Sequence, residues 1–446
     1  MSNASSDKNL ILSLNAGSSS LKISLYEPSA PSGSVEFLVK PVKLLLKSTI
    51  SSISSPPAQF SFESVSLSSQ CHKDEKIDSI TDHASAFSHF LHCLKQEASI
   101  DGRRITRICH RVVHGGDYTD PVEISQEAYD HIENLSDLAP LHNSAALSVI
   151  KACISTLPDA KSIAYFDTTF HTTLPIHISS YAIDQNIAHK KGLKKYGFHG
   201  LSYAFILNAV SQYLQKPKES LNLILLHLGS GASACAVQNG KSLDTSMGLT
   251  PLSGLPGATR SGTIDPSLIF HYTARAGRMS HDPNVATHVG VTRAEDLLNR
   301  KSGWKALTGT TDFGVIASKA ELGNRDPALS AQNPYRLAFD LFVDRILDFV
   351  GSYHLKLKGD VDAIVFAGGI GERSVELRAI VSDRIACLGY RALCPEKNER
   401  ASSSDNVVQD ISAERRQEAN ERPKRILICR TDEQLEMARQ CAQAHF

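Results

Sequence analysis

The sequence predicts an α/β protein in which one fold occurs twice, with the two copies arranged around a central cleft. The chain has 446 residues, which is too long for one hydrophobic core and suggests two domains of roughly 150 to 250 residues each. A hairpin pattern with a small polar turn occurs at residues 9–26 and returns at residues 222–237. Because the pattern marks both halves, we expect a duplicated fold whose two turns converge on one site.

The first hairpin has a turn that suits an anion. An aliphatic run at residues 10–14 has the length of a strand, residues 15–20 read Asn-Ala-Gly-Ser-Ser-Ser, and apolar residues then alternate with polar ones. Glycine and serine let backbone N–H groups and hydroxyls approach a phosphate, and Lys22 adds a positive charge. A solvated hairpin turn is the alternative, since short phosphate-loop patterns also arise by chance.

The second hairpin repeats this arrangement. It has an aliphatic run, a small turn with Gly229, Ser230 and Gly231, and a second strand. When the two hairpins are aligned on their glycines, His227 takes the place of Asn15. The repetition favours two phosphate-facing turns over two unrelated loops.

Composition narrows the class of protein. Basic and acidic residues are equal at 47 each, which argues against a protein that mainly binds nucleic acid or an anionic membrane. No apolar run approaches the roughly 20 residues of a membrane span, and the N-terminus lacks the apolar core of a secretory signal. Nine cysteines without a CxxC pair fit free thiols better than disulfides or a zinc site. We therefore expect a cytoplasmic location.

Two segments have little periodicity, and two others predict helices. Residues 28–78 are rich in serine and proline, which predicts loops, an edge hairpin or partial disorder. Residues 393–425 are charged and poor in aromatics, which predicts a loop or disordered insert. Apolar residues at helical spacing predict helices near residues 85–98 and 336–353.

An arginine lies near the end of a predicted strand over residues 108–113. Arg111 precedes Gly115 and Gly116, which allow a ligand or backbone to approach closely. A guanidinium there can bind a carboxylate or phosphate through two parallel hydrogen bonds. A surface ion pair is the alternative.

Polar residues in three loops form a second group of candidates. His142 follows a proline-containing turn, Asp167 ends a predicted strand, His171 follows it, and His199 lies between glycines at a helix start. A single histidine is more often structural, but several on loops beside glycine, proline and aspartate suggest a site. The sequence has no HExxH pattern, so a zinc hydrolase is poorly supported.

Two glycine-rich segments complete the candidates. Residues 244–266 form a long segment with proline and glycine that carries Arg260, and long structureless loops in compact domains are usually functional. A strand at residues 362–366 leads into a turn with Gly369 and Gly371 before a helix. Such a turn can bind nucleotide phosphate at the helix N-terminus, and a tight structural turn is the alternative.

With these motifs in place, the sequence resembles the acetate kinase family, within the acetate and sugar kinase, Hsp70 and actin superfamily. Matching blocks between residues 15 and 439, in the family's order, are LNAGSSSLK, HRVVHGG, APLHN, FDTTFH, YGFHG, HLGSGAS, DTSMGLTPLSGLPGATRSGTIDP, FAGGIGE and TDEQLEMAR. The resemblance implies two duplicated ribonuclease-H-like domains, the actin-like ATPase fold, around a central cleft. It also implies an N-terminal domain of residues 1–169 plus 432–446 and a nucleotide-binding domain of residues 170–431.

The implied reaction is reversible, direct in-line transfer of the γ-phosphoryl group of ATP to acetate, giving acetyl phosphate and ADP. A carboxylate needs no general base at neutral pH, so catalysis would consist of positioning and charge stabilisation. Arg111 and Arg260 would hold the carboxylate and the metaphosphate-like transition state, and His199 would donate to its equatorial oxygens. Asp167 would orient Arg260 and the acetate, with His142 in support.

The resemblance implies further binding residues. The methyl group of acetate would enter an apolar pocket of Val113, Leu141, Phe198 and Pro251. Asn15 and Glu433 would position Mg²⁺ or Mn²⁺, directly or through water. The nucleotide would be bound by Lys22, His227, Leu228, Gly229, Ser230, Gly231, Asp312, Phe313, Gly369, Ile370 and Gly371. A homodimer is expected from the family.

Three positions on the nucleotide side depart from the bacterial and archaeal pattern. Ser230 and Arg373 replace residues that are usually asparagine, and Gly314 stands where an arginine is common. The resemblance therefore defines the identity of the phosphoryl donor less closely than that of the acceptor. The two inserts resemble those of longer fungal members. Kinases for propionate or butyrate, a pyrophosphate-dependent enzyme and a non-catalytic actin-like protein are the alternatives.

Overall fold

The computed structural model describes residues 9–29, 41–65, 71–135, 143–272, 292–324, 326, 328–414 and 424–444. The chain divides into two compact units, Met1–Thr169 with Asp432–Phe446, and Phe170–Thr431. Two residues assigned to the site by the resemblance, Leu141 and His142, lie outside the described residues.

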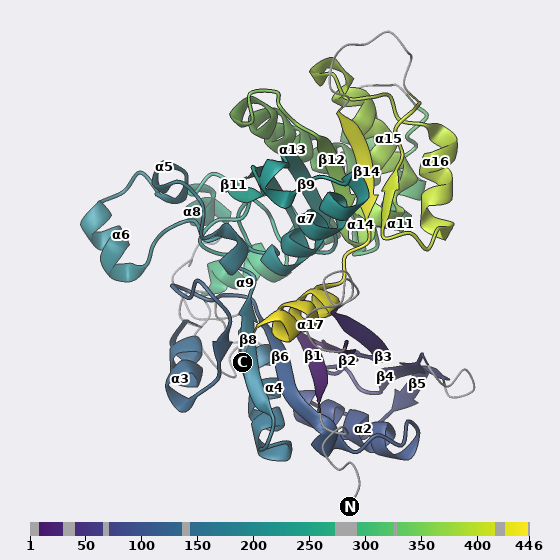
Figure 1. Ribbon diagram of the computed structural model, residues 1–446. Helices are drawn as coiled ribbons and strands as arrows, with labels where there is room; N and C mark the ends of the chain where they lie inside the picture. The colour runs from purple at the N-terminus through teal and green to yellow at the C-terminus, as the bar shows by residue number, and fades with distance from the viewer. Residues whose placement is uncertain are drawn as a thin grey trace, which may run out of the picture. The chain divides into compact units, whose positions relative to one another are not determined.

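The first unit is built on one mixed sheet (Figure 1). Its first hairpin forms as predicted, with antiparallel pairing that places Asn15 opposite Lys22. The hairpin strand then pairs in parallel with the strand that carries Arg111. The strands in spatial order are β5 (Cys71–Ile77), β4 (Ala58–Ser64), β3 (Val42–Ser51), β2 (Ser20–Pro28), β1 (Leu10–Gly17), β6 (Ile105–Val112), β8 (Lys161–Phe166) and β7 (Val122–Glu123).

Of the three alternatives predicted for residues 28–78, the edge hairpin comes nearest to the structure, and loops or partial disorder are wrong for most of the described part of that segment. Strands β3, β4 and β5 extend the sheet beyond the first hairpin by antiparallel pairing. Their inward residues, such as Ile50, Phe60 and Phe62, are buried against the core. Ser48 and Ser64 occupy buried, inward positions of these strands, so the inward face does not appear as an unbroken set of apolar residues in the sequence.

Helices cover both faces of the first sheet. The predicted helix near residue 85 is confirmed as α2 (His83–Gln96), which begins with a reciprocal cap between Asp82 and Ser85. It packs with α4 (Ser144–Thr156) on one core, and α3 (Gln126–Asn134) lies beside α4. The last helix, α17 (Glu433–Gln443), returns to pack on β1, β2, β3 and β6.

The second unit has its own mixed sheet (Figure 1). The second predicted hairpin is confirmed by antiparallel pairing of residues 223–228 with residues 232–237. The strands in spatial order are β11 (Lys241–Thr245), β10 (Ala232–Gln238), β9 (Leu223–Leu228), β12 (Ala363–Ala367), β14 (Arg425–Cys429) and β13 (Val408–Asp410).

The helices of the second unit include the long predicted amphipathic helix, which is confirmed as α13 (Pro334–Lys356). Its apolar face lies in the core beneath β9 and β10. The other helices are α5 (Ile176–Ser179), α6 (Gln185–Lys191), α7 (Gly200–Leu214), α8 (Leu268–Tyr272), α9 (Arg293–Arg300), α10 (Gly303–Thr308), α11 (Phe313–Lys319), α12 (Leu329–Gln332), α14 (Gly368–Arg373), α15 (Val375–Arg384) and α16 (Pro395–Arg400).

The two sheets share one topology, which confirms the predicted duplication. In the first unit β3, β2 and β1 are antiparallel neighbours, and β1, β6 and β8 are parallel. In the second unit β11, β10 and β9 are antiparallel neighbours, and β9, β12 and β14 are parallel. Each unit therefore presents its hairpin turn and the carboxyl ends of its parallel strands at one edge of its sheet.

The described part of the insert at residues 393–425 is ordered, which corrects the prediction of a loop or disorder there. The insert contributes α16 and β13, and Asn398 is buried against Arg378 of α15. Within the described residues, no helix is long and apolar enough to cross a membrane.

Candidate active-site residues in each unit

Arg111 and Asp167 form a bidentate ion pair in the first unit. The Arg111 Nη2 atom lies 2.6 Å from Asp167 Oδ2, and Nε lies 3.2 Å from Oδ1. The Asp167 side chain is fully buried, whereas 18% of the Arg111 side chain is exposed. We expected Asp167 to orient Arg260, and within its own unit its carboxylate holds the Arg111 guanidinium in one plane.

Asn15 and Glu433 join this ion pair. Arg111 Nη1 donates to Asn15 Oδ1 at 3.1 Å, Asn15 Nδ2 donates to Glu433 Oε2 at 2.7 Å, and Arg111 Nε lies 3.4 Å from Glu433 Oε2. Burial alone would lower the pKa of Arg111, but the charges of Asp167 and Glu433 outweigh it and raise the pKa above its usual value. The guanidinium is therefore charged, oriented and partly open to a ligand.

The fold explains why these residues meet. Asn15 lies on β1, Arg111 lies on the neighbouring β6, and Asp167 follows β8, so all three come from the carboxyl ends of adjacent parallel strands. Glu433 is the first residue of α17, which packs on β1 and β6. Chain ends that are far apart in sequence thus supply one polar cluster.

The loop after Arg111 is fixed by close packing. His114 is fully buried, and Asn143 bonds both its backbone N–H and its carbonyl at 3.0 Å. A Cβ on Gly115 would lie 2.5 Å from the Phe166 ring, so no other residue fits. Val113, assigned to the methyl pocket, is half-buried beside this loop, and Lys22 is exposed on β2.

In the second unit His199 is held at the start of α7. It has φ +59°, a left-handed conformation that is uncommon for a residue other than glycine and clusters at functional sites. Its Nδ1 lies 2.8 Å from Ser233 Oγ on β10, and its ring lies 4.3 Å from the His227 ring. The preceding residue, Phe198, is buried.

Arg260 and His199 border the turn of the second hairpin. A Cβ on Gly231 would lie 3.0 Å from Arg260 Nη1 and 3.8 Å from His199 Nε2. The Arg260 loop is tied to this turn, since the Ala258 N–H donates to the Ser230 carbonyl at 2.8 Å. A guanidinium, an imidazole nitrogen and a glycine-rich turn therefore surround one spot, which suits a phosphoryl group.

The glycines predicted to form a turn before a helix, Gly369 and Gly371, instead lie within helix α14, which begins directly after β12, and they adjoin the turn of the second hairpin. A Cβ on Gly229 would lie 3.9 Å from the backbone nitrogen of Gly369. Gly368 has φ +74° and packs on the Leu228 carbonyl, which excludes a side chain there. Arg373 Nε donates to the Gly369 carbonyl at 3.0 Å. Ile370 packs on the core, and Gly371 is buried.

The remaining predicted nucleotide-side residues have mixed positions. Asp312 caps α11 through a 2.8 Å bond from the Gly314 N–H. Phe313 is buried against Trp304 and Phe342 and so belongs to the core. Pro251 is buried in the long glycine-rich segment, which carries no helix or strand between residues 246 and 267, as predicted.

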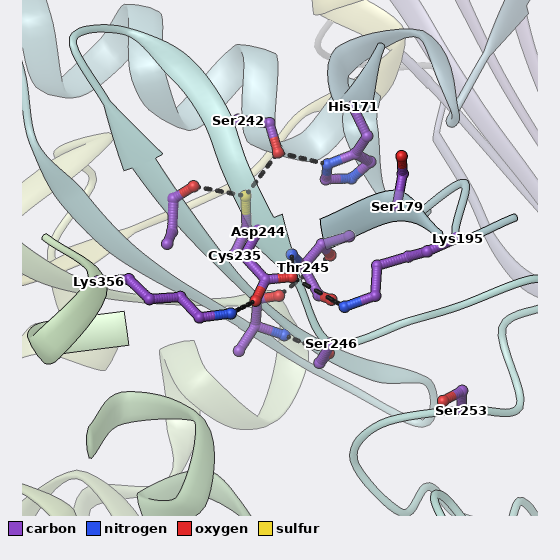
Figure 2. A network of polar contacts seen from close by, with 12 residues as sticks. His171, Ser179, Lys195, Cys235, Ser242, Asp244, Thr245, Ser246, Ser253 and Lys356 are labelled. Atoms are coloured by element: carbon purple, nitrogen blue, oxygen red, sulfur yellow. Dashed lines mark hydrogen bonds and ion pairs between the residues drawn. The ribbon is translucent and has the colours of Figure 1, made fainter. Parts of the chain in front are cut away.

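A polar network around Asp244 was not predicted (Figure 2). Asp244 of β11 is buried between Lys195, whose Nζ lies 2.9 Å from Oδ1, and Lys356 of α13. Lys195 also donates to the Thr245 carbonyl at 3.2 Å. The network anchors the loop that leads to His199, and the sequence held no signal for it because the partners are 49 and 112 residues apart from Asp244.

His171 also holds the loop that leads to His199, through the backbone of Phe198. Its Nε2 lies 3.0 Å from the Phe198 carbonyl, and its Nδ1 lies 2.8 Å from Ser242 Oγ. Burial lowers the pKa of His171 to about 4, so the ring is neutral near pH 7. Because a carbonyl can only accept, Nε2 carries the proton and Nδ1 accepts from Ser242. His171 is a structural residue here.

A fold present twice, with one clamped arginine and one glycine-rich turn beside a second arginine, is the architecture of an actin-like phosphotransferase. A model of the acetokinase family matches residues 10–439. The chain belongs to the acetokinase family, whose enzymes transfer phosphoryl groups to a carboxylate, and its two units are duplicated ribonuclease-H-like domains.

Named relatives agree with this assignment. A probable acetate kinase of Emericella nidulans is 48% identical over 439 residues, which cover 97% of each chain. A probable acetate kinase of Neurospora crassa is 46% identical and covers 98% of this chain and 94% of its own length. Among solved structures, a propionate kinase from Francisella tularensis has a TM-score of 0.78 at 30% identity, with 97% of this chain and 98% of that chain covered. The acetate kinase of Porphyromonas gingivalis has a TM-score of 0.75 at 28% identity, with the same coverage.

Proposed function

We propose that this protein is an acetate kinase that transfers the γ-phosphoryl group of ATP reversibly and directly to acetate. The observation that carries the proposal is the Arg111 clamp, in which Asp167 and Asn15 fix a partly exposed guanidinium. Membership of the acetokinase family and the names of the relatives support the same reaction.

The acceptor is activated by position rather than by proton removal. Acetate is ionised at neutral pH, so its oxygen is already a nucleophile. Arg111 offsets the repulsion between the carboxylate and the incoming phosphoryl group. Because its hydrogen bonds already orient the guanidinium, the side chain does not have to reorient during the reaction. Val113, Phe198 and Pro251 are the described apolar side chains that we assign to the methyl group.

The residues of the second unit that we assign to the phosphoryl donor are called the donor half of the site. They stabilise charge on the transferring phosphoryl group. Arg260 and the Nε2 atom of His199 lie at the turn of Gly229, Ser230 and Gly231, where the β- and γ-phosphates would bind. Developing charge on the equatorial oxygens then meets one cation and one N–H donor. Residues Gly369, Ile370 and Gly371 border the adenosine in this assignment.

Asn15 and Glu433 fit the divalent cation that kinases of this family use. Magnesium prefers oxygen ligands and binds through one or two carboxylates, substrate phosphates and water. Glu433 supplies a carboxylate of which 13% is exposed, and the Asn15 amide adjoins it. When bound, Mg²⁺ or Mn²⁺ would neutralise phosphate charge, and this chain would hold it through Glu433 and Asn15.

Propionate is the second candidate acceptor. The propionate kinase of Francisella tularensis has the higher TM-score of the two structures named above. One additional methylene in an apolar pocket changes binding by only about 1 to 3 kcal/mol, so related kinases differ little. Acetate is our first choice because the fungal relatives with 46 to 48% identity carry that name.

A hydroxamate assay tests the function. Acetate, propionate and butyrate are each offered with ATP, GTP or pyrophosphate in the presence of Mg²⁺, and hydroxylamine traps the acyl phosphate. We expect the highest rate with acetate and ATP. Absence of hydroxamate above the enzyme-free background in every pair would remove the enzyme assignment. Highest activity with pyrophosphate would change the donor and keep the acceptor.

We also infer a cytoplasmic homodimer. Eight described cysteines are free thiols, which fits a reducing compartment. In the second unit α5, α6 and α8 expose large apolar side chains, among them Ile176 (81% exposed) and Phe270 (75% exposed). Such side chains gather at interfaces between subunits.

A further inference from the structure

Ser233 is a buried hydroxyl between two side chains of the second unit. Its Oγ lies 2.8 Å from His199 Nδ1, and it also bonds the hydroxyl of Tyr203. Ser233 and Tyr203 are both fully buried, and Tyr203 lies on the first turn of α7. The three side chains form a chain of hydrogen bonds that ends on the ring of His199.

The relative donor strength of the two hydroxyl groups favours one direction for these bonds. A phenol, with a pKa of about 10, is a stronger donor than an aliphatic hydroxyl, so Tyr203 donates to Ser233. The single proton of Ser233 is then directed to its other partner, Nδ1 of His199. The opposite order would leave a buried serine proton directed at the tyrosine oxygen and would use the stronger donor as an acceptor.

We propose that Tyr203 and Ser233 are positioning residues that hold neutral His199 as the tautomer with its proton on Nε2. That nitrogen borders Gly231, where the transferring phosphoryl group is assigned. His199 can donate to an equatorial oxygen from Nε2 only in this tautomer or as an imidazolium. This chain of hydrogen bonds from Tyr203 through Ser233 to His199 is called the relay below. It therefore supplies a hydrogen-bond donor at Nε2 without a second full positive charge beside Arg260.

Other groups that face His199 favour its neutral form. Arg260 approaches from the loop at residues 257–262, and His227 approaches from β9 with its ring 4.3 Å away. Tyr203, on the helix α7 that follows His199, bonds Ser233 and lies edge-on to the His227 ring with 6.5 Å between ring centroids. A neighbouring guanidinium disfavours protonation of an imidazole, so the choice of tautomer matters at the pH of the reaction.

Nitrogen NMR on the full-length protein tests the tautomer without relying on turnover. The protein carries ¹⁵N-histidine, and a His199→Gln variant assigns the signals. At pH 8 we expect a pyridine-type shift at Nδ1 of His199 and a pyrrole-type shift at Nε2. The reverse pattern in the wild-type protein would overturn the inference. The catalytic consequence rests on the proposed function, but this measurement stands if the protein transfers no phosphate.

A pH profile separates the relay from a merely structural role. Ser233→Ala should lower kcat by about tenfold at pH 8, since about 1.4 kcal/mol of hydrogen-bond preference is lost. The loss should be smaller at pH 5, because a larger fraction of His199 is then imidazolium, which carries protons on both nitrogens. Tyr203→Phe keeps the Ser233 hydroxyl and should show a smaller loss with the same pH trend. A loss in Ser233→Ala that is equal at both pH values would contradict the relay.

Discussion

Arg260 is the residue on which the donor half of the proposed site depends most. Arg260→Ala should lower kcat by about 10³-fold or more, because loss of one arginine that stabilises transition-state charge in phosphoryl transfer has effects of this size. The KM for ATP should change much less, since the charge develops mainly in the transition state. Steady-state kinetics measure both constants, and circular dichroism controls for folding. A kcat near that of the wild type would remove Arg260 from its role.

Arg111 is clamped within its own unit by Asp167 and Asn15. Arg111→Lys keeps the charge but cannot bond both Asp167 oxygens and Asn15 in one plane. We expect kcat/KM for acetate to fall by about 10²-fold, with less change in the KM for ATP. The assay varies acetate at saturating ATP. An unchanged kcat/KM for acetate would show that the planar clamp is not used for the acceptor.

Two buried histidines make stability depend on pH. Burial lowers the pKa of His171 to about 4 and that of His110 to about 3. Since both folded-state pKa values lie below the usual histidine value of 6.5, their stabilising contribution is present above pH 6.5 and decreases as the pH falls toward 4. Each neutral histidine should contribute a slope of up to about 1.4 kcal/mol per pH unit in that window.

Urea unfolding at pH 7, 6 and 5 measures this slope. The wild-type protein should lose stability over the series, and His171→Asn should lose less of its own stability between pH 7 and 5. The variant is expected to be less stable at pH 7, because two hydrogen bonds of His171 are changed. Equal slopes for variant and wild type would show that His171 is not the titrating group.

At the residue scale, short sequence motifs identified residues that stand in a recognisable local pattern. They missed residues whose role depends on contacts with distant parts of the sequence. Arg111 was evident because it stands beside two glycines at a strand end. Ser233 was not, because nothing in a run of small residues shows that one hydroxyl faces His199 across 34 positions of sequence. Its position follows from the register of β10 with β9, where it is paired with His227.

At the scale of elements, α17 places Glu433, from near the end of the chain, beside Asn15 and Arg111 of the first unit. Glu433→Gln should raise the Mg²⁺ concentration for half-maximal rate by about tenfold, because a carboxylate binds the cation more tightly than an amide. At saturating Mg²⁺ the rate should recover in large part. A Mg²⁺ titration at fixed ATP makes the measurement. An unaltered midpoint would exclude Glu433 as the residue that holds the metal.

Elements with strong periodicity could be predicted, whereas those with mixed signals could not. The apolar face of α13 and the hairpin of β1 and β2 followed from their patterns. Strands β3 and β4 were predicted only as one of three alternatives, an edge hairpin, because serine-rich positions conceal a two-residue alternation. Their stability comes from pairing with β2 and from burial of Phe60 and Phe62, which no local window contains.

At the scale of the molecule, duplication could be read from the sequence because the hairpin is copied with its turn. The internal pairing of each sheet then repeats in the same order. The last residues of the chain, 432–446, belong to the first unit because of the topology of the fold. The sequence indicated this only through family resemblance.

Self-association is the molecular property that the exposed apolar side chains predict. Wild-type protein should behave as a dimer in light scattering coupled to gel filtration, and Phe270→Glu should weaken the dimer by at least tenfold in Kd, since it places a charge in an apolar contact. Val65→Glu is a matched control, because Val65 is 61% exposed in the other unit. Dimers of equal stability in all three proteins would place the interface elsewhere.

The most direct test of the central claim is a single-turnover rapid-quench experiment with γ-³²P-labelled ATP, Mg²⁺ and acetate. Direct transfer predicts that the label passes from ATP to acetyl phosphate in one phase, with no labelled protein at any time. Label that appears first on the protein, or only in inorganic phosphate, would contradict the account.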